Sequence, residues 1–375
     1  MKEWIYVRAG DFIEFNPRLN IKKGITATKI SMDKLQPFSK KILGAESAVF
    51  TGGAKFRNGD TIMARITPCL ENGKTAFVDI LNDGEIGFGS TEFIVLRARK
   101  GISDPQFIYY LATSPFFRKQ AIKSMVGSSG RQRVQQNVLD NLELKVPDIV
   151  TQEKIGYILS CFDKKIAINK QINDNLEQQI SALYESWFEN FDLTNGVCPE
   201  GWNNQELSTI TQISNGKRPP IKAESCSKET PIPIVGAASV MGFTSEANHT
   251  DKILVTGRVG THGIVQRFNA PCWTSDNTLV IKSSYYEFTN QILQRIDYSA
   301  MNRGSTQPLI TQGDMKKVSI LLPDVETLAK FETFAGTMMN QWETNNQENV
   351  KLASLRDTLL PKLMSGELDI SDIDL

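Results

Sequence analysis

The sequence predicts an α+β protein: two mixed α/β domains, related by a pseudo-twofold axis, joined by two long antiparallel helices that form a coiled coil. Two observations lead to this class. The second half of the chain repeats the first, and each repeat ends in a Pro-led segment with helical periodicity. After a shift of 176 residues without gaps, Pro147-Asp148 falls on Pro323-Asp324, and residues 136–183 match at 10 of 48 positions. Such a repeat defines the architecture before any local motif is interpreted.

The repeat divides the 375 residues into four regions. We expect a first domain over 1–146, a central long-helix region over 147–192, a second domain over 193–322, and a distal long-helix region with a C-terminal tail over 323–375. A chain of this length has room for two or three domains of ordinary size.

Charge alternates in phase with the repeat, although the net charge of the whole chain is zero. Residues 1–150 carry a net charge of +7 and residues 201–322 carry +3, whereas residues 151–200 carry −4 and residues 323–375 carry −6. Basic domains favour a polyanionic partner, and acidic helices favour contacts with other proteins.

Composition places the chain in the cytoplasm with no membrane partner. No segment approaches the roughly 18 apolar residues of a membrane span, and the start lacks the apolar run of a signal peptide. The five cysteines are scattered without a Cys-x-x-Cys pair. We therefore expect neither a disulfide framework nor a zinc site.

Both domain segments consist of short β-rich runs punctuated by Gly and Asn, which indicates small mixed α/β domains. Each has a strand-like run that leads into an arginine, Asp60–Arg65 in the first and Lys252–Arg258 in the second. Each closes with a Ser-rich segment, at 127–133 and 303–307. Small residues beside Arg and Gln suit close approach to phosphates, with side chains reaching bases. They equally suit an ordinary solvated loop.

The two helical segments carry the heptad spacing of a coiled-coil seam, with apolar residues alternately three and four positions apart. Asparagines interrupt both seams at matching positions: Asn169 and Asn173 in the first, Asn345 and Asn349 in the second. A buried Asn fixes the register of a helix pair at a cost in stability. The alternative is that these residues face solvent at a bend. Because the ends of a compact domain lie close together, the intervening domain makes the helices antiparallel.

Catalytic motifs are absent. Gly73-Lys74-Thr75 ends like a phosphate-binding loop, but Pro68 stands where its first glycine should be. The two histidines, His249 and His262, lie far from any partner suited to metal or triad chemistry. We therefore expect no catalytic residue and no metal site on this chain.

The whole chain resembles the specificity (S) subunit of type I restriction–modification systems. The residues that carry the resemblance are the two Pro-Asp segments with their Asn-bearing helices, the Trp4 and Trp202 that open the domains, and the tail Leu360–Leu368. The resemblance implies two target-recognition domains, each reading one half of a bipartite, asymmetric site on double-stranded DNA. One departure is Leu328-Ala329 where the first helix has Gln152-Glu153, so the second docking surface is expected to differ from the first.

The resemblance also implies partners and cofactors. The helices would space the domains and dock two modification (methyltransferase) subunits, and the assembly would recruit restriction subunits. S-adenosylmethionine, ATP and Mg are expected on those partners and none on this chain. A helix of about 40 residues is roughly 60 Å long, so the pair would act as a ruler between two half-sites.

Candidate DNA-binding residues follow from the basic segments. They are Arg65, Lys74, Arg131 and Arg133 for the first half-site, and Lys217, Arg218, Arg258 and Arg303 for the second. The rival interpretation is a coiled-coil interaction scaffold with two domains that bind ligands other than DNA. Its support is the overall neutrality and the lack of a familiar helix-turn-helix or zinc module.

Overall fold

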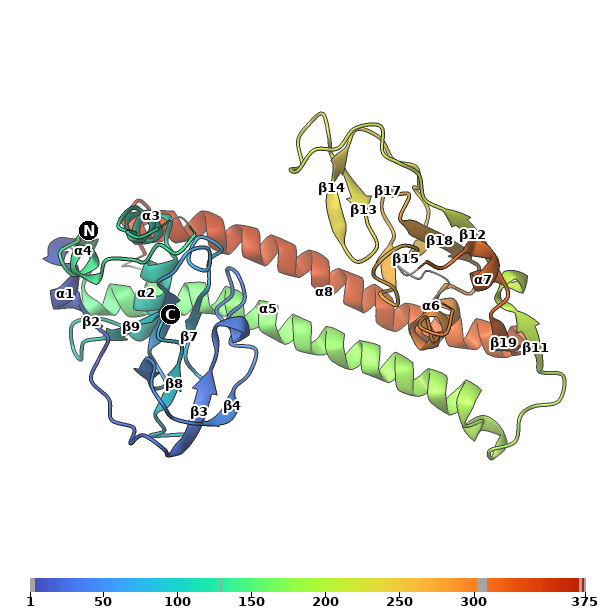
Figure 1. Cartoon of the computed structure of the whole chain (residues 1–375), viewed down its shortest axis with the longest axis horizontal. Helices are drawn as coiled ribbons and strands as arrows, with labels where there is room; N and C mark the ends of the chain where they lie inside the picture. Colours follow the sequence, from blue (N-terminus) through green and yellow to red (C-terminus); the bar gives the residue numbers. More distant parts are fainter. Residues whose placement is uncertain (1–3, 129, 302–308, 371–372, 374–375) are drawn as a thin grey trace. The chain divides into compact units, whose positions relative to one another are not determined.

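The computed structural model describes residues 4–128, 130–301, 309–370 and 373. The chain forms two compact units (Figure 1). Unit 1 comprises Met1–Lys170 and Asn346–Leu375, and unit 2 comprises Gln171–Asn345. Each unit therefore contains one globular region and a part of each long helix. In the described part of the chain, no helix is both long and apolar enough to cross a membrane.

Unit 1 contains three sheets. Its two-stranded antiparallel sheet pairs β1 (Ile5–Arg8) with β10 (Glu143–Val146). One four-stranded sheet is antiparallel throughout, in the order β2 (Ile13–Phe15), β9 (Phe93–Ala98), β6 (Thr61–Ala64), β7 (Thr75–Phe77). The other has the order β4 (Glu46–Val49), β3 (Thr26–Ile30), β8 (Gly87–Gly89), β5 (Lys55–Phe56), with β3 and β8 parallel.

Helices cover these sheets and complete the core of unit 1. The shorter ones are α1 (Ala9–Phe12), η1 (Met32–Lys34), α2 (Pro105–Thr113), α3 (Pro115–Lys123) and α4 (Gln136–Asp140). Helix α2 begins with Pro105 at its first turn, and the Asp104 carboxylate accepts a hydrogen bond from the Phe107 N–H, as expected of an N-cap. Its buried Phe107 packs in one core with Leu159 and Leu363, which come from the two long helices.

Unit 2 repeats this arrangement. Its two-stranded sheet pairs β11 (Asn203–Glu206) with β19 (Ser319–Leu322). Its four-stranded sheet has the strand order β12 (Thr211–Asn215), β18 (Thr278–Ser283), β15 (Ile253–Gly257), β16 (Gln266–Phe268). Its three-stranded sheet has the order β14 (Val240–Thr244), β13 (Ile232–Val235), β17 (Trp273–Thr274). Its shorter helices are η3 (Asp192–Thr194), η4 (Leu207–Thr209), α6 (Tyr286–Arg295) and α7 (Gln312–Lys316). As in unit 1, the central strand of the third sheet, β13, is antiparallel to β14 and parallel to β17.

The long helices are α5 (Ile149–Tyr184), extended by a π-helical turn η2 (Glu185–Glu189), and α8 (Val325–Ser365). In unit 1 the start of α5 packs on the end of α8, where Asp163 and Arg356 form an ion pair of 2.5 Å. In unit 2 the end of α5 packs on the start of α8, where the rings of Phe188 and Phe331 lie 5.2 Å apart. The helices are therefore antiparallel. The predicted class, two repeated mixed α/β domains joined by two long antiparallel helices, is confirmed.

The four seam asparagines meet in two equivalent pairs. In unit 1 the Asn169 Nδ2 donates to the Asn349 Oδ1 (3.0 Å) and to Glu348 (2.7 Å). In unit 2 the Asn345 Nδ2 donates to the Asn173 Oδ1 (2.8 Å). The 176-residue shift maps one pair onto the other with the same donor. Asn169, Asn173 and Asn345 are buried, so they do not face solvent; their role in fixing the register stays a prediction.

Candidate nucleic-acid interface

Arg65 and Arg258 occupy the same position in the two units. Each directly follows the central strand of its first large sheet, β6 or β15. The Arg65 N–H donates to the Glu92 carbonyl and the Arg258 N–H to the Asn277 carbonyl, both at 2.8 Å. The Arg65 carbonyl accepts from the Val134 N–H, and the Arg258 carbonyl accepts from the Ile310 N–H. Matching backbone bonds on both sides therefore hold the two arginines in equivalent places.

Within the described residues, each guanidinium group has one nitrogen without a hydrogen-bond partner. Both Nε atoms are buried without a hydrogen-bond partner, and in the described part of the chain neither side chain forms an ion pair. A buried donor without an acceptor costs about 1–3 kcal/mol, and more when it is charged. Both groups are thus suited to an acceptor from outside the chain, such as a phosphate or a base edge.

In unit 1 a basic hollow of about 580 Å³ surrounds Arg65. None of the described residues that line it is acidic; they are Asn16, Pro17, Arg18, Leu19, Gly53, Ala54, Lys55, Arg65, Thr91, Phe93 and Val95. The Asn16 side chain places the segment that carries Arg18, because its Oδ1 accepts from the Val95 N–H (2.9 Å) and its Nδ2 donates to Gln136 (2.7 Å). Three cations around a hollow without a carboxylate can bind an anionic backbone.

Sequence motifs single out neither Arg18 nor Lys55. Both reach the hollow through topology, since they lie on chain segments 47 and 10 residues before Arg65. A sequence pattern cannot show which loops share one edge of a sheet. The useful signal would have been the order of the strands.

The other candidate DNA-binding residues of unit 1 differ in whether they already bind groups of their own unit. The Lys74 ammonium group donates to the Met32 carbonyl (3.0 Å). The Arg133 guanidinium group binds the Glu92 carboxylate through both of its oxygens, with the shortest contact at 2.7 Å. This hydrogen bonding lowers the pKa of Glu92. Arg131 is exposed. Lys74 and Arg133 therefore already support the chain around Arg65, whereas Arg131 is accessible to a ligand.

In unit 2 a turn at 274–278 brings two of the candidates together. The Lys217 N–H donates to the Thr274 carbonyl (2.9 Å), and the Arg258 N–H donates to the Asn277 carbonyl. The Lys217 carbonyl in turn accepts from the Trp273 indole N–H (2.7 Å). Lys217 and Arg218 are exposed. Arg303 lies outside the described residues.

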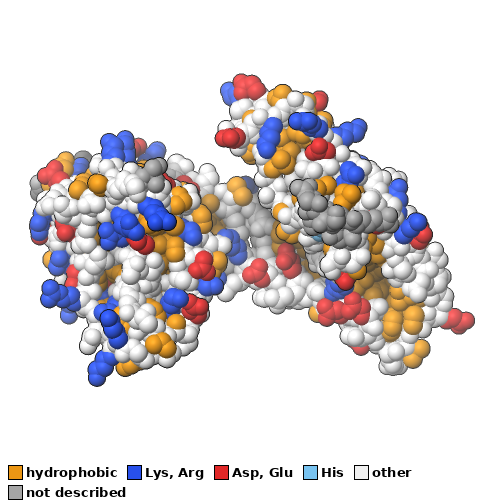
Figure 2. Space-filling view, in the orientation of Figure 1, with side chains coloured by type: hydrophobic (Ala, Val, Ile, Leu, Met, Phe, Trp, Pro, Cys, Tyr) orange, Lys and Arg blue, Asp and Glu red, His pale blue; other side chains and the backbone are white. Residues whose placement is uncertain are grey.

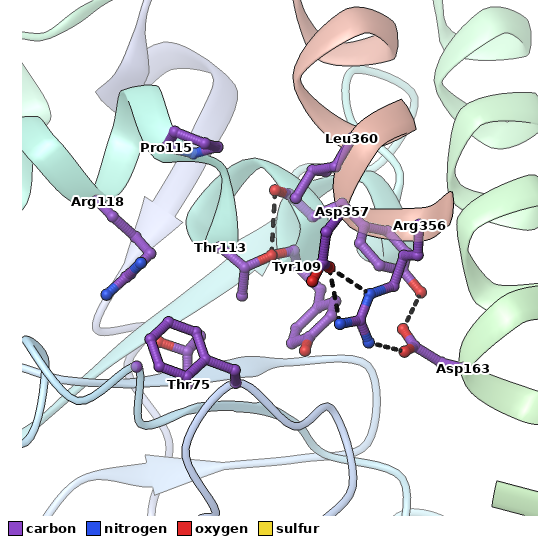
Figure 3. Close-up of a pocket in the computed structure, with 12 residues that line it drawn as sticks. Thr75, Tyr109, Thr113, Pro115, Arg118, Asp163, Arg356, Asp357 and Leu360 are labelled. Carbon is purple, nitrogen blue, oxygen red and sulfur yellow. Dashed lines mark hydrogen bonds and ion pairs between the residues drawn. The ribbon is translucent and has the colours of Figure 1, made fainter. Parts of the chain in front are cut away.

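A second hollow in unit 1, of about 200 Å³, lies between the globular region and the long helices (Figure 3). There Arg356 on α8 pairs with Asp163 on α5 and with its neighbour Asp357. The Tyr110 hydroxyl donates to Asp163 (2.5 Å) and lies 3.3 Å from the Lys40 ammonium group. Burial lowers the pKa of Lys40 to about 8, against the opposing attraction of Asp163. These charged groups bind one another, so they tie unit 1 together.

Across residues 4–128, 130–301, 309–370 and 373, no three His, Cys, Asp or Glu side chains gather as a metal site would require.

Comparison with known proteins identifies the family. The model of the type I restriction modification DNA specificity domain matches residues 1–178 and 199–351. The chain belongs to this family. The repeat found in the sequence is thus the family's domain, present twice.

Relatives agree with this assignment. The type I restriction enzyme HindI specificity subunit of Haemophilus influenzae is 23% identical, over 83% of this chain and 87% of its own length. The MjaIX specificity subunit of Methanocaldococcus jannaschii is 25% identical, over 72% of this chain and 70% of its own. The crystal structure of the type I restriction-modification S subunit from M. genitalium shares the fold, with a TM-score of 0.59, 17% identity and 96% of both chains covered.

Proposed function

We propose that this chain is the DNA sequence-specificity subunit of a type I restriction–modification complex, in which each globular region reads one half of a bipartite, asymmetric site. The observation that carries the proposal is the equivalent placement of Arg65 and Arg258, each with a buried Nε atom that has no hydrogen-bond partner in the described chain. A repeated scaffold that presents one equivalent arginine per repeat is suited to two separate half-sites. Family membership supports this function over the scaffold alternative.

The chemistry of recognition follows from the side chains. Exposed cations such as Lys217 and Arg131 would contact phosphates, which gives affinity that falls as salt rises. An arginine whose backbone N–H and carbonyl are both hydrogen-bonded can present its planar guanidinium group to a base edge. Guanine is the commonest bidentate partner of arginine there. The surroundings of Arg65 and Arg258 differ, so the two half-sites should differ in sequence.

Partners supply the chemistry in this proposal. The acidic long helices would dock two modification subunits, which hold S-adenosylmethionine, and restriction subunits would bring ATP and Mg. The chain itself would be non-catalytic and cytoplasmic. Support comes from the charge of the helical regions and from the names of the relatives, which are specificity subunits.

Methylation mapping tests the function. The chain is co-expressed with its modification subunit in a host free of DNA methylation, and N6-methyladenine is mapped with and without the chain. The proposal predicts a split motif, two short specific halves around a fixed gap, that appears only with the chain. A complex that assembles without producing any motif would contradict the proposal and favour the scaffold.

An insertion tests the ruler separately. Four residues added after Asn173 lengthen α5 by roughly 6 Å and rotate the C-terminal part of the helix about its axis. The gap in the mapped motif should change while both half-site sequences stay the same. A changed half-site with an unchanged gap would refute the ruler.

A further inference from the structure

The β13–β14 hairpin of unit 2 presents an uncharged, partly apolar tip. Residues 231–245 contain no charged side chain. The strands pair up to Val235 opposite Val240, and the Gly236 N–H donates to the Ser239 carbonyl (2.8 Å), which closes the turn. At the tip Val240 is 43% exposed and Met241 is 41% exposed. The Met241 sulfur lies over Gly236, 3.1 Å from where a methyl group on that residue would stand. The tip therefore has a compact, partly exposed apolar surface.

One side of this tip adjoins Arg258. The Gly236 carbonyl accepts a hydrogen bond from the Gln266 side chain on β16 (2.7 Å). The Ala237 Cβ lies 3.0 Å from where a methyl group on Gly257, the residue before Arg258, would stand. The turn of the hairpin thus packs directly against the strand end that presents Arg258.

The other side of the tip adjoins two lysines. Val235 pairs with Thr274, whose carbonyl accepts from the Lys217 N–H. The aliphatic carbons of Lys222 lie 3.2 and 3.3 Å from the Cβ position of Gly242, next to Met241. Hydrophobic, basic and acidic side chains share the lobe that carries β13 and β14 (Figure 2). An apolar tip therefore stands between cations on both sides.

We propose that Val240 and Met241 form a wedge that enters the base stack of the DNA held by Lys217, Lys222 and Arg258, and unstacks one base step in the half-site of unit 2. This inference rests on the proposed function. Proteins that kink DNA combine apolar side chains, inserted between base pairs, with cations that hold the flanking phosphates. The cost of unstacking depends on the step, so the wedge would add specificity at a position without a direct base contact.

The equivalent connection of unit 1 is built differently. The connection between β3 and β4 spans residues 31–45 and contains Lys34, Lys40 and Lys41. It folds back on its own unit: Phe38 stacks with Arg118, its ring centroid 4.8 Å from the guanidinium carbon, and the Phe38 N–H donates to the Gly73 carbonyl (3.0 Å). Phe38 and Leu43 of this connection are 59% and 55% exposed, and Phe38 already packs on Arg118; the wedge is proposed for the half-site of unit 2.

Fluorescence of 2-aminopurine tests the wedge in the assembled complex with its modification subunits. Duplexes of the mapped site carry the probe at successive positions of both halves, and its fluorescence rises when neighbouring bases unstack. The adenine to be methylated keeps its natural base, because extrusion by a methyltransferase would also raise the signal. The test variant is Val240→Ser/Met241→Gln. The control is Val49→Ser, which changes a similarly exposed valine on β4 of unit 1.

The wedge predicts that 2-aminopurine fluorescence rises several-fold at one base step. That step should lie in the half-site whose sequence preference is relaxed by Arg258→Ala. The double variant should lose the rise and bind the site about tenfold more weakly, about 1.4 kcal/mol, whereas Val49→Ser should match the parent. Tight, sequence-specific binding by the parent without any rise, or a rise that persists in the double variant, would overturn the wedge and leave the proposed function intact. Failure of the parent to bind any duplex would instead overturn the function. Loss of assembly with the modification subunits in the double variant would identify the tip as a protein contact and overturn the wedge.

Discussion

The two globular regions place an arginine at the end of the same central strand but surround it differently. Beside Arg65 stands Glu92, whose carboxylate is bound by Arg133. Beside Arg258 the corresponding backbone partners are Asn277, whose carbonyl accepts from the Arg258 N–H, and Ile310, whose N–H donates to the Arg258 carbonyl. Among the described residues, unit 1 thus places an ion pair beside its arginine, whereas unit 2 places the neutral Asn277 and Ile310 there. A repeated backbone keeps the position of the reading residue, while its neighbours are free to differ.

The largest expected effect concerns two equivalent ion pairs, one buried in unit 1 and the other exposed in unit 2. On β9 of unit 1, Arg97 binds Asp60 in the core at 2.7 Å; at the equivalent position of β18 in unit 2, Lys282 binds Asp251 at the surface. Arg97→Ala leaves a buried carboxylate without its partner and should lower the free energy of unfolding by about 3–5 kcal/mol. Lys282→Ala should cause no measurable loss, because exposed pairs contribute little. Urea unfolding of both purified variants provides the comparison, and equal losses would contradict it.

Removal of either reading arginine should have the next largest effect. Arg65→Ala and Arg258→Ala should each weaken binding of the mapped site by about 1–3 kcal/mol and relax sequence preference in one half. Lysine at either position keeps the charge without the planar fork, so Arg65→Lys should recover affinity more than specificity. Binding to a panel of single-base variants of the site measures both quantities. Lys164→Ala, on the exposed surface of α5, is the control and should leave the preference unchanged.

A smaller effect depends on pH and is confined to unit 1. Burial lowers the pKa of Lys40 to about 8, so between pH 8 and its unfolded value near 10.4 the unfolded chain binds more protons than the folded chain. Stability should therefore rise with pH in that window, by up to about 1.4 kcal/mol per pH unit. Lys40→Met should remove this rise. Urea unfolding at pH 7.5 and 9.5 measures it, and an identical pH dependence in the variant would show that another group is responsible.

The smallest expected change in stability belongs to the double variant of the paired asparagines Asn173 and Asn345. Asn173→Leu alone leaves the Asn345 amide buried without its acceptor and should cost about 1–3 kcal/mol. Asn173→Leu together with Asn345→Leu removes both polar groups and should be close to neutral. If the pair fixes the register, the double variant should nevertheless methylate motifs with more than one gap length. A single unchanged gap would leave register to the apolar seam.

The sequence predicted the repeat and the antiparallel helices because both depend on local periodicity and on chain topology. It also selected Arg65 and Arg258, because each directly ends a strand-like run. It could not place Arg18 and Lys55 in the same hollow, since that depends on which loops share a sheet edge. Nor could it tell that Lys74 and Arg133 bind groups of their own domain. A basic residue in a loop has the same sequence signature whether or not it is already paired.

In the proposed function, each domain reads its own half of one split site. The most direct test maps N6-methyladenine in a methylation-free host that expresses the modification subunit. The host also expresses either the parent chain, the Arg65→Ala variant or the Arg258→Ala variant. If each domain reads one half, the first variant should relax the sequence of one half and the second variant that of the opposite half, with the gap unchanged in both. Relaxation of the same half by both variants, or no change in either half, would contradict it.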